Sequence, residues 1–217
     1  MKKLFQPADA SPSIRKMLAM SRFKQFRAGQ IIVHQGTISE EVYLVIKGSV
    51  TVESYDDQGQ RLVFHYIRPG EFFGEMGMFD DDLRRSATVV ARAHCEIAVV
   101  EIGVFRSLIE EDASLLMELA RQLAERVRKT TEKLTNLAFL DVTGRVARTV
   151  LELAEDEEAM SHPDGTLISI TREELGRMVN CSREMAGQVL KTLEERGLIN
   201  LEGRKIVVLS TRSTVAW

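Results

Sequence analysis

The sequence has 217 residues, a length that favours two domains, and its 44% hydrophobic and 28% charged residues are typical of a folded protein rather than a disordered or fibrous one. The formal net charge of −3 argues against a protein that wraps DNA by phosphate neutralisation alone, so any DNA contact must be local. No apolar run approaches the ~18 residues needed to cross a bilayer, so we expect a cytoplasmic protein without a membrane partner.

Residues 22–104 contain short apolar and β-branched runs at regular intervals. These runs are 31–33, 42–46, 50–52, 62–64, 87–90 and 95–100. Turn residues such as Gly36, Gly48 and Gly70 separate them. Strands spaced in this way predict a closed or sandwiched antiparallel β domain, for which a roll is the best fit.

A long helix is predicted from residue 113 onward, after a short helix over 105–111, because no Gly or Pro then occurs before Gly144. Its apolar seam alternates spacings of four and three and consists of Leu116, Ala120, Leu123, Val127, Thr130, Leu134 and Leu137. This is the heptad pattern of a two-stranded coiled coil and predicts a homodimer. The alternative is a single amphipathic helix that packs on its own β domain.

Helical patterning resumes after Asp141, a residue type suited to capping a helix N-terminus. The run His-Pro-Asp-Gly at 162–165 ends it, and two short helical stretches follow Thr171. Residues 198–201 and 205–209 then have the pattern of a β-hairpin. Helix, turn, helix and hairpin in this order predict a winged helix-turn-helix.

The most informative segment of the β-rich region is Gly-Glu-Met-Gly-Met-Phe at 74–79, followed six residues later by Arg85, Ser86 and Ala87. It resembles the phosphate-binding cassette of cyclic-nucleotide-binding domains. The resemblance extends without evident gaps over residues 23–212 and includes Leu-Ala-Phe-Leu-Asp-Val-Thr-Gly-Arg at 137–145. On these residues the chain is identified as a member of the cyclic AMP receptor protein family of bacterial transcription regulators.

This resemblance implies an α+β fold in three parts. Residues 1–112 would form a cyclic-nucleotide-binding β-roll, 113–137 a coiled-coil dimerisation helix, and 138–217 a winged helix-turn-helix that binds DNA. Cyclic AMP would be the allosteric ligand, and double-stranded DNA, RNA polymerase and a second copy of the chain would be the partners. The nucleotide is expected to reposition the long helices and, through a hinge near 137–141, to orient both recognition helices on a palindromic promoter site.

The chemistry of the cassette agrees with this expectation. A cyclic phosphate is an anion, and the Arg85 guanidinium can engage two of its oxygens while Ser86 adds a hydroxyl and a backbone donor. Gly74 and Gly77 permit a tight turn and close approach of the backbone. Glu75 would repel a phosphate, so its expected partner is the ribose 2′-hydroxyl. Without the resemblance to this family, Arg85 would be interpreted as an ordinary surface arginine.

Thr130 places a hydroxyl in the seam, which costs packing free energy unless something hydrogen-bonds to it. The resemblance implies that Thr130 meets the adenine from the same subunit and that Thr131 meets it from the other. A role limited to coiled-coil register is the alternative. The nucleotide-binding residues expected in all are Gly74, Glu75, Met76, Arg85, Ser86, Arg126, Thr130 and Thr131.

Residues 171–184 fit a helix-turn-helix. Thr171 and Ser182 can cap its two helices, Gly176 permits close helix packing, and Asn180 tolerates the left-handed conformation of the turn. The inward positions of the second helix are Ala186, Val189 and Leu190. The residues expected to bind DNA are Thr171, Arg172, Ser182, Arg183, Glu184, Gln188 and Lys191.

The resemblance assigns roles to these outward side chains. Arg183 and Glu184 match residues that contact guanine and cytosine edges in the major groove, which suits their donor and acceptor chemistry, and Arg172 is expected to contact phosphate. Gln188 departs from the family pattern, which usually has arginine there. We therefore expect a half-site close to TGTGA with weaker discrimination at one base pair. A solvated helix with a charged outer face is the alternative.

Two surface features bear on RNA polymerase. Residues 159–165 resemble the family's exposed activating loop, with a simple Pro-Gly turn as the alternative, and Arg22 and Lys24 match a basic second activating patch. Val104 stands where that patch usually has its third basic residue. We therefore expect the second surface to be weak.

Other function classes fit less well. Cys95 and Cys181 are too few for a disulfide framework, a four-ligand zinc site or an iron–sulfur cluster, so we expect no metal. The four histidines are scattered and no catalytic spacing emerges, so we expect neither an enzyme nor catalytic residues. Within the class, the ligand could instead be cyclic di-GMP, or none. A regulatory module of the kind attached to kinases or channels would lack the helix-turn-helix.

Overall fold

The structure is a computed structural model, and it describes residues 5–7, 10–38, 40–55, 61–79, 84–156, 159–203 and 205–209. The chain divides into two compact units, Lys3–Thr131 and Glu132–Trp217. Their boundary falls inside helix α3 (Ser114–Phe139), so the long helix contributes to both units.

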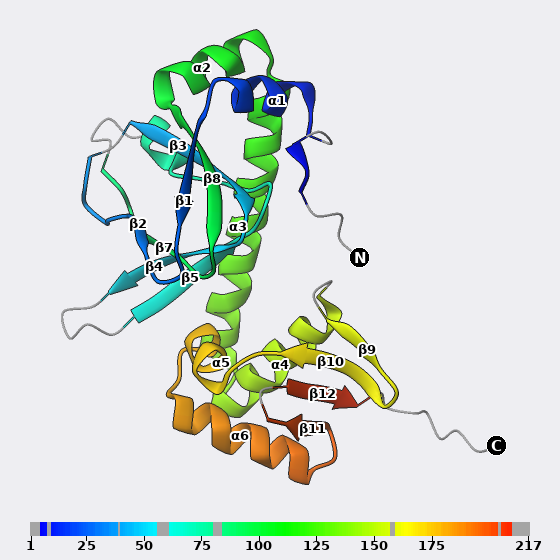
Figure 1. The fold of residues 1–217 in the computed structure, drawn as a ribbon. Coiled ribbons are helices and arrows are strands. Elements are labelled where there is room, and N and C mark those ends of the chain that lie inside the picture. Colours follow the sequence, from blue (N-terminus) through cyan, green and yellow to red (C-terminus); the bar gives the residue numbers. More distant parts are fainter. Residues whose placement is uncertain are drawn as a thin grey trace. The chain divides into compact units, whose positions relative to one another are not determined.

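The first unit is a β-roll of two four-stranded antiparallel sheets, with strand orders β1-β8-β3-β6 and β2-β7-β4-β5 (Figure 1). Each strand run predicted from the sequence falls on an observed strand, which confirms the expected fold class. Its elements are α1 (Pro12–Ala19), β1 (Arg22–Phe26), β2 (Ile31–Val33), β3 (Glu41–Lys47), β4 (Val50–Tyr55), β5 (Arg61–Ile67), β6 (Phe72–Phe73), the 3₁₀ helix η2 (Glu75–Met78), β7 (Thr88–Ala91), β8 (Cys95–Glu101), α2 (Ile102–Glu111) and α3.

Two hydrophobic cores flank the sheet that contains β3 and β6. Leu44 and Phe72 face the core beneath the helices, where the Phe72 ring meets Phe105 edge-on at 5.6 Å. Tyr43 and Phe73 face the core between the sheets and stack with ring centroids 4.7 Å apart. Because the two phenylalanines of β6 are buried on opposite sides, the backbone that leads into η2 is firmly positioned.

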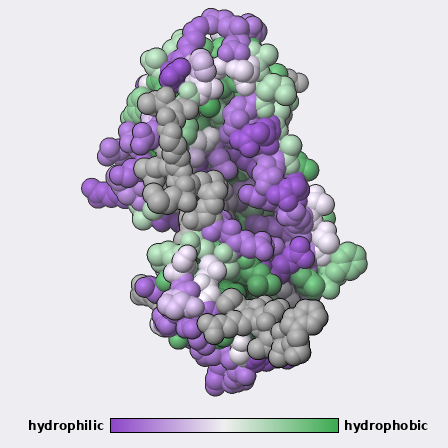
Figure 2. Space-filling view, turned by 90° about the vertical axis from the view of Figure 1, so that its right-hand side faces the viewer, coloured by the Kyte–Doolittle hydropathy of each residue, from purple (hydrophilic) through white to green (hydrophobic). Residues whose placement is uncertain are grey.

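Helix α3 packs on the roll through one face only. Leu115 and Leu119 are fully buried, and the Gln122 side chain accepts from the Phe72 amide at 2.9 Å and donates to the Gly70 carbonyl at 3.0 Å. The predicted seam lies on another face and stays largely exposed, with Val127 66% and Leu134 67% accessible. The surface visible in Figure 2 is mainly hydrophilic with separate hydrophobic patches. A continuous row of exposed apolar side chains along one helix is typical of an interaction surface.

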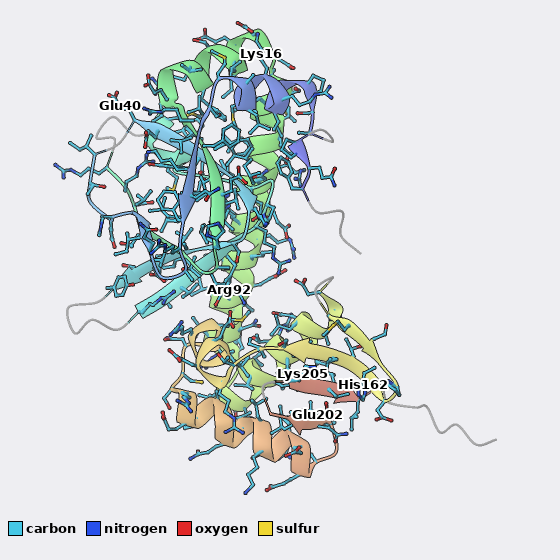
Figure 3. All side chains as sticks on the ribbon, viewed as in Figure 1. Lys16, Glu40, Arg92, His162, Glu202 and Lys205 are labelled. Atoms are coloured by element: carbon cyan, nitrogen blue, oxygen red, sulfur yellow. The ribbon has the colours of Figure 1, made fainter. Side chains whose placement is uncertain are left out.

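The second unit has the helix-turn-helix and hairpin order expected from the sequence. A four-stranded sheet of order β11-β12-β10-β9 accompanies the helices, and Glu202 and Lys205 are partners where the β11–β12 hairpin turns (Figure 3). Its further elements are α4 (Val142–Glu155), β9 (Met160–His162), β10 (Gly165–Ser169), α5 (Arg172–Val179), α6 (Arg183–Glu195), β11 (Ile199–Glu202) and β12 (Lys205–Leu209).

Residues 160–169 form the β9–β10 hairpin, where the sequence indicated only a turn or loop. The core of this unit lies between the helices and the sheet, with Val146, Leu175 and Ile206 almost inaccessible. Asp141 caps α4 as expected, because its Oδ1 accepts from the Gly144 amide at 2.7 Å. None of the helices formed by the described residues is long and apolar enough to span a bilayer.

Candidate functional site

The first unit contains a cavity of about 760 Å³ between β4, β5, the η2 segment, β7 and α3. This is within the range of small-molecule sites. The structure brings the predicted nucleotide-binding residues of one chain to this cavity, including Thr131, which the resemblance assigns to the ligand of the other subunit. Its lining includes Gly74, Glu75, Met76, Arg85, Ser86, Arg126, Thr130 and Thr131.

Gly74 and Arg85 both line the cavity and are in close contact with each other. Gly74 adopts φ +79°, and a Cβ there would lie 2.7 Å from Nη1 of Arg85 and 2.9 Å from the Tyr43 ring, so only glycine is accommodated. The Arg85 guanidinium donates to the carbonyls of Gly74 and Glu41, both at 2.6 Å, and lies 5.5 Å from the Tyr43 ring centroid. These contacts fix the plane of a side chain that is only 5% exposed.

Glu75 is buried in the same wall, at the start of η2. Its Oε1 accepts from Nη1 of Arg126 at 2.7 Å, and Arg126 also donates to the Phe72 carbonyl. Its Oε2 is buried and has no hydrogen-bond partner among the described residues. An unsatisfied buried carboxylate oxygen costs about 1–3 kcal/mol or more, so the site favours a ligand that supplies a hydrogen-bond donor here.

The hydroxyls of the cavity come from two directions. Ser86 Oγ lies 3.5 Å from Met76 Sδ on the cassette side. On α3, Thr130 and Thr131 donate to the carbonyls one turn earlier, at 2.8 and 3.0 Å. Thr130 Oγ1 is also 3.2 Å from Nε2 of His65, a cavity residue to which the sequence argument gave no role.

A sequence signal for His65 does exist. It lies on β5 between Val63 and Ile67, which are both buried, so an alternating inward face places a histidine among apolar residues. A histidine at such a position is a candidate for contact with a ligand.

The helix-turn-helix of the second unit has the local chemistry expected of it. Thr171 accepts from the Glu174 amide and Ser182 from the Met185 amide, both at 3.1 Å, so both predicted caps are observed. Asn180 ends α5 in the left-handed conformation with φ +56°. A Cβ on Gly176 of α5 would lie 2.7 Å from the Cys181 carbonyl oxygen, so glycine here lets the turn pack closely against the helix.

All of the side chains predicted to bind DNA are exposed. They are Thr171, Arg172, Ser182, Arg183, Glu184, Gln188 and Lys191. The buried face of α6 consists instead of Ala186, Val189, Leu190 and Leu193. Burial raises the pKa of the Cys181 thiol in the turn, so this cysteine is protonated at neutral pH.

Comparison with known proteins agrees with both halves of this description. Residues 23–112 match the cyclic nucleotide-binding domain family, and residues 144–213 match the Crp-like helix-turn-helix domain family. The cAMP-activated global transcriptional regulator Vfr of Pseudomonas aeruginosa is 47% identical over 200 residues, which are 91% of this chain and 94% of Vfr. The chain belongs to the cyclic AMP receptor protein family.

Two further relatives of this family are informative. The cAMP-activated global transcriptional regulator CRP of Salmonella typhimurium is 43% identical over 94% of this chain and 97% of its own. The solved structure of CLP from Xanthomonas campestris, described as a c-di-GMP responsive global regulator, superposes with a TM-score of 0.84 at 38% identity and covers 92% of this chain and 99% of CLP.

Membership of the cyclic AMP receptor protein family establishes the general function. The chain is a transcription regulator with a cyclic-nucleotide-binding domain and a DNA-binding helix-turn-helix, and the family is not enzymatic. Within the part of the chain that the structure describes, no group of three or more His, Cys, Asp or Glu side chains could hold a metal ion.

Proposed function

We propose that this protein is a cyclic AMP-dependent, sequence-specific transcription regulator that acts as a homodimer on palindromic promoter sites. The observation that carries the ligand assignment is the arrangement of Glu75, Arg85 and Arg126 around one cavity. The buried Oε2 of Glu75 requires a donor such as a ribose 2′-hydroxyl, while the fixed guanidinium of Arg85 suits an anionic phosphate.

The remaining cavity residues suit the other parts of a cyclic mononucleotide. Ser86 and the backbone around Gly74 and Met76 would donate to the cyclic phosphate beside Arg85. Thr130 would meet the adenine from the same subunit and Thr131 from the partner subunit. The names of two relatives, Vfr and CRP, describe them as cAMP-activated, which supports cyclic AMP as the ligand.

The exposed seam of α3 supports the homodimer. Leu116, Val127, Leu134 and Leu137 are 38%, 66%, 67% and 45% accessible, although the neighbouring face of the helix is buried on the roll. A second copy of the same helix would cover this row by coiled-coil packing. A two-fold dimer presents two recognition helices and therefore matches a palindromic site.

The recognition helix α6 would enter the major groove of double-stranded DNA. Arg183 and Glu184 lie exposed in its first turn, as expected for residues that contact guanine and cytosine edges, and Gln188 follows one turn later. Thr171 and Ser182 at the helix N-termini, together with Arg172 and Lys191, would contact the phosphate backbone.

Activation would require contact with RNA polymerase in the cytoplasm. The β9–β10 hairpin would provide the first contact surface, with Met160 49% exposed. Arg22 and Lys24 are exposed but both lie near Glu41 Oε1, at 3.0 and 3.6 Å, and Val104 packs against the core instead of adding a third cation. These contacts support a weak second surface.

Cyclic di-GMP is the second candidate ligand, favoured by the similarity to CLP. Calorimetric titration of the full chain with cyclic AMP, cyclic GMP and cyclic di-GMP distinguishes the candidates. We expect heat of binding with cyclic AMP at the lowest concentration. Heat with cyclic di-GMP alone would overturn the ligand assignment, and a monomer by sedimentation at micromolar concentration would overturn the homodimer.

A further inference from the structure

Two side chains from different elements meet inside the cavity. His65 lies on β5 and Thr130 on α3, and Nε2 of the imidazole is 3.2 Å from the hydroxyl oxygen. Val52 is the partner of His65 in the β4–β5 ladder and also lines the cavity, so the strand pairing holds the imidazole on the inner face of the sheet. The roles proposed for the other cavity residues make no use of this histidine.

The direction of the hydrogen bond follows from the second contact of Thr130. Its hydroxyl donates to the main-chain carbonyl of Arg126, 2.8 Å away and one turn earlier in α3. A hydroxyl has one proton, so toward His65 the same oxygen is an acceptor. Nε2 must then carry a proton, as it does in both the neutral Nε2–H tautomer and the imidazolium. His65 therefore keeps the Thr130 hydroxyl in one orientation, with its proton directed to the Arg126 carbonyl.

In that orientation the Thr130 hydroxyl offers a ligand a lone pair and no proton, so it can only accept a hydrogen bond. An exocyclic amino group can donate to this lone pair, whereas a carbonyl oxygen in the same place would bring two acceptors together. Thr130 is exposed at the cavity, and a ligand that covers its hydroxyl without donating to it leaves polar groups unpaired, so the site discriminates against that ligand.

We propose that His65 is a specificity-determining positioning residue: it fixes Thr130 as an acceptor and so selects cyclic purine nucleotides with an amino group at C6 over those with a carbonyl. This inference rests on the proposed function, because it takes the cavity as the site of a cyclic purine nucleotide. Without the imidazole, the hydroxyl can turn its proton from the Arg126 carbonyl to a base carbonyl.

The test compares the affinities of the full chain for cyclic AMP and cyclic inosine monophosphate. These ligands differ in the C6 substituent and in the N1 proton that accompanies the carbonyl. His65→Leu is expected to reduce the preference for cyclic AMP by roughly three- to tenfold, the effect of one hydrogen bond. The matched control is His94→Leu, since His94 is exposed between β7 and β8 and does not line the cavity. Its preference should equal that of the wild type.

Two further variants separate positioning from a structural role. His65→Gln keeps a side-chain N–H donor and should retain most of the preference. In a Thr130→Val background, where the hydroxyl is absent, His65→Leu should no longer change the preference.

The outcomes are distinguishable. A wild-type protein that binds neither nucleotide overturns the proposed function and this inference together. A wild type that binds cyclic AMP but has the same preference as His65→Leu overturns the inference alone. An effect of His65→Leu that persists without the Thr130 hydroxyl also overturns it, because His65 would then act directly on the ligand.

Discussion

Nη1 of Arg126 lies 2.7 Å from Oε1 of Glu75, and this ion pair joins the long helix α3 to the 3₁₀ turn of the cassette. Both side chains are largely buried, at 17% and 3% exposure, so solvent screens the pair little. A nucleotide that binds the second oxygen of Glu75 shares its carboxylate with α3. If a nucleotide binds there, its affinity should depend on the contact between α3 and the roll. DNA binding that alters this contact should then change the nucleotide affinity by the same factor by which the nucleotide changes the DNA affinity.

Arg85→Leu should lower the affinity for cyclic AMP by at least about 100-fold, because it removes the charge-assisted donors to the phosphate. The chain should remain folded, although the carbonyls of Gly74 and Glu41 lose their donor and the melting temperature should fall by several degrees. Calorimetry and thermal unfolding measure the two effects. Arg27→Leu is the control, since Arg27 is an exposed arginine that does not line the cavity. Equal loss in both variants would mean that net charge alone attracts the ligand.

Glu75→Gln tests the partner of the ribose. In the wild type, 2′-deoxy cyclic AMP should bind roughly tenfold or more weakly than cyclic AMP, because the hydroxyl donates to a charged acceptor. In Glu75→Gln this penalty should shrink to a fewfold difference, since the acceptor is neutral. The ligand pair provides the control for any general damage to the cavity. An identical penalty in both proteins would remove Glu75 from the ribose site.

Leu134→Asp should dissociate the dimer and abolish DNA binding, because two carboxylates would face each other in an apolar seam. Leu134 is a better probe than Leu123, which packs partly against the core of the roll and also lines the cavity. Sedimentation velocity measures the oligomeric state. Thr135→Asp adds the same charge outside the seam and should leave the dimer intact. A dimer that persists in Leu134→Asp would exclude this seam as the interface.

Gln188→Arg should sharpen base preference at one position of the half-site by about 1–3 kcal/mol, because arginine is suited to guanine O6 and N7 while glutamine is suited to adenine. Gln188 is exposed on α6, so the change should not affect folding. Binding-site selection with cyclic AMP at fixed salt should give a site close to TGTGA for both proteins. Identical preferences at every position would show that residue 188 does not contact bases.

The contact between Ser13 and Asp112 gives a pH-dependent prediction. The Ser13 hydroxyl and the Ser114 amide both donate to the Asp112 carboxylate and hold its pKa below the ordinary value. The stabilisation is present above the unfolded pKa and is lost as the pH falls through the lower folded pKa. Ser13→Ala should raise the pKa of Asp112 in a carboxyl NMR titration. It should lower stability at neutral pH and have less effect in acid, and an unchanged titration would contradict the assignment.

The local features of the second unit were predictable because each depends on a few neighbouring residues. Asp141, Thr171 and Ser182 cap the helices at the predicted positions, and Asn180 takes the left-handed conformation. The strands of the roll were predictable where apolar residues are continuous, as in β3, which is buried on both faces.

Elements with a weak local pattern could not be predicted. Strand β1 has the sequence Arg-Phe-Lys-Gln-Phe and is almost entirely exposed, so only its pairing with β8 makes it a strand. Helix α1 has eight residues and is held by tertiary contacts such as those of Ser13 and of Lys16 with Glu111. The contact of His65 with Thr130 joins residues far apart in the sequence, and no local pattern reports such a distance.

Helix α3 runs from Ser114 to Phe139 without glycine or proline, and the boundary between the two compact units lies within it. A continuous helix has high torsional and bending stiffness because every turn is tied to the next by main-chain hydrogen bonds. If a ligand rotates α3 at Thr130, we therefore expect the rotation to be passed along the helix toward Phe139. The first residues outside the helix are Leu140 and Asp141, so we expect the chain to bend there rather than within α3.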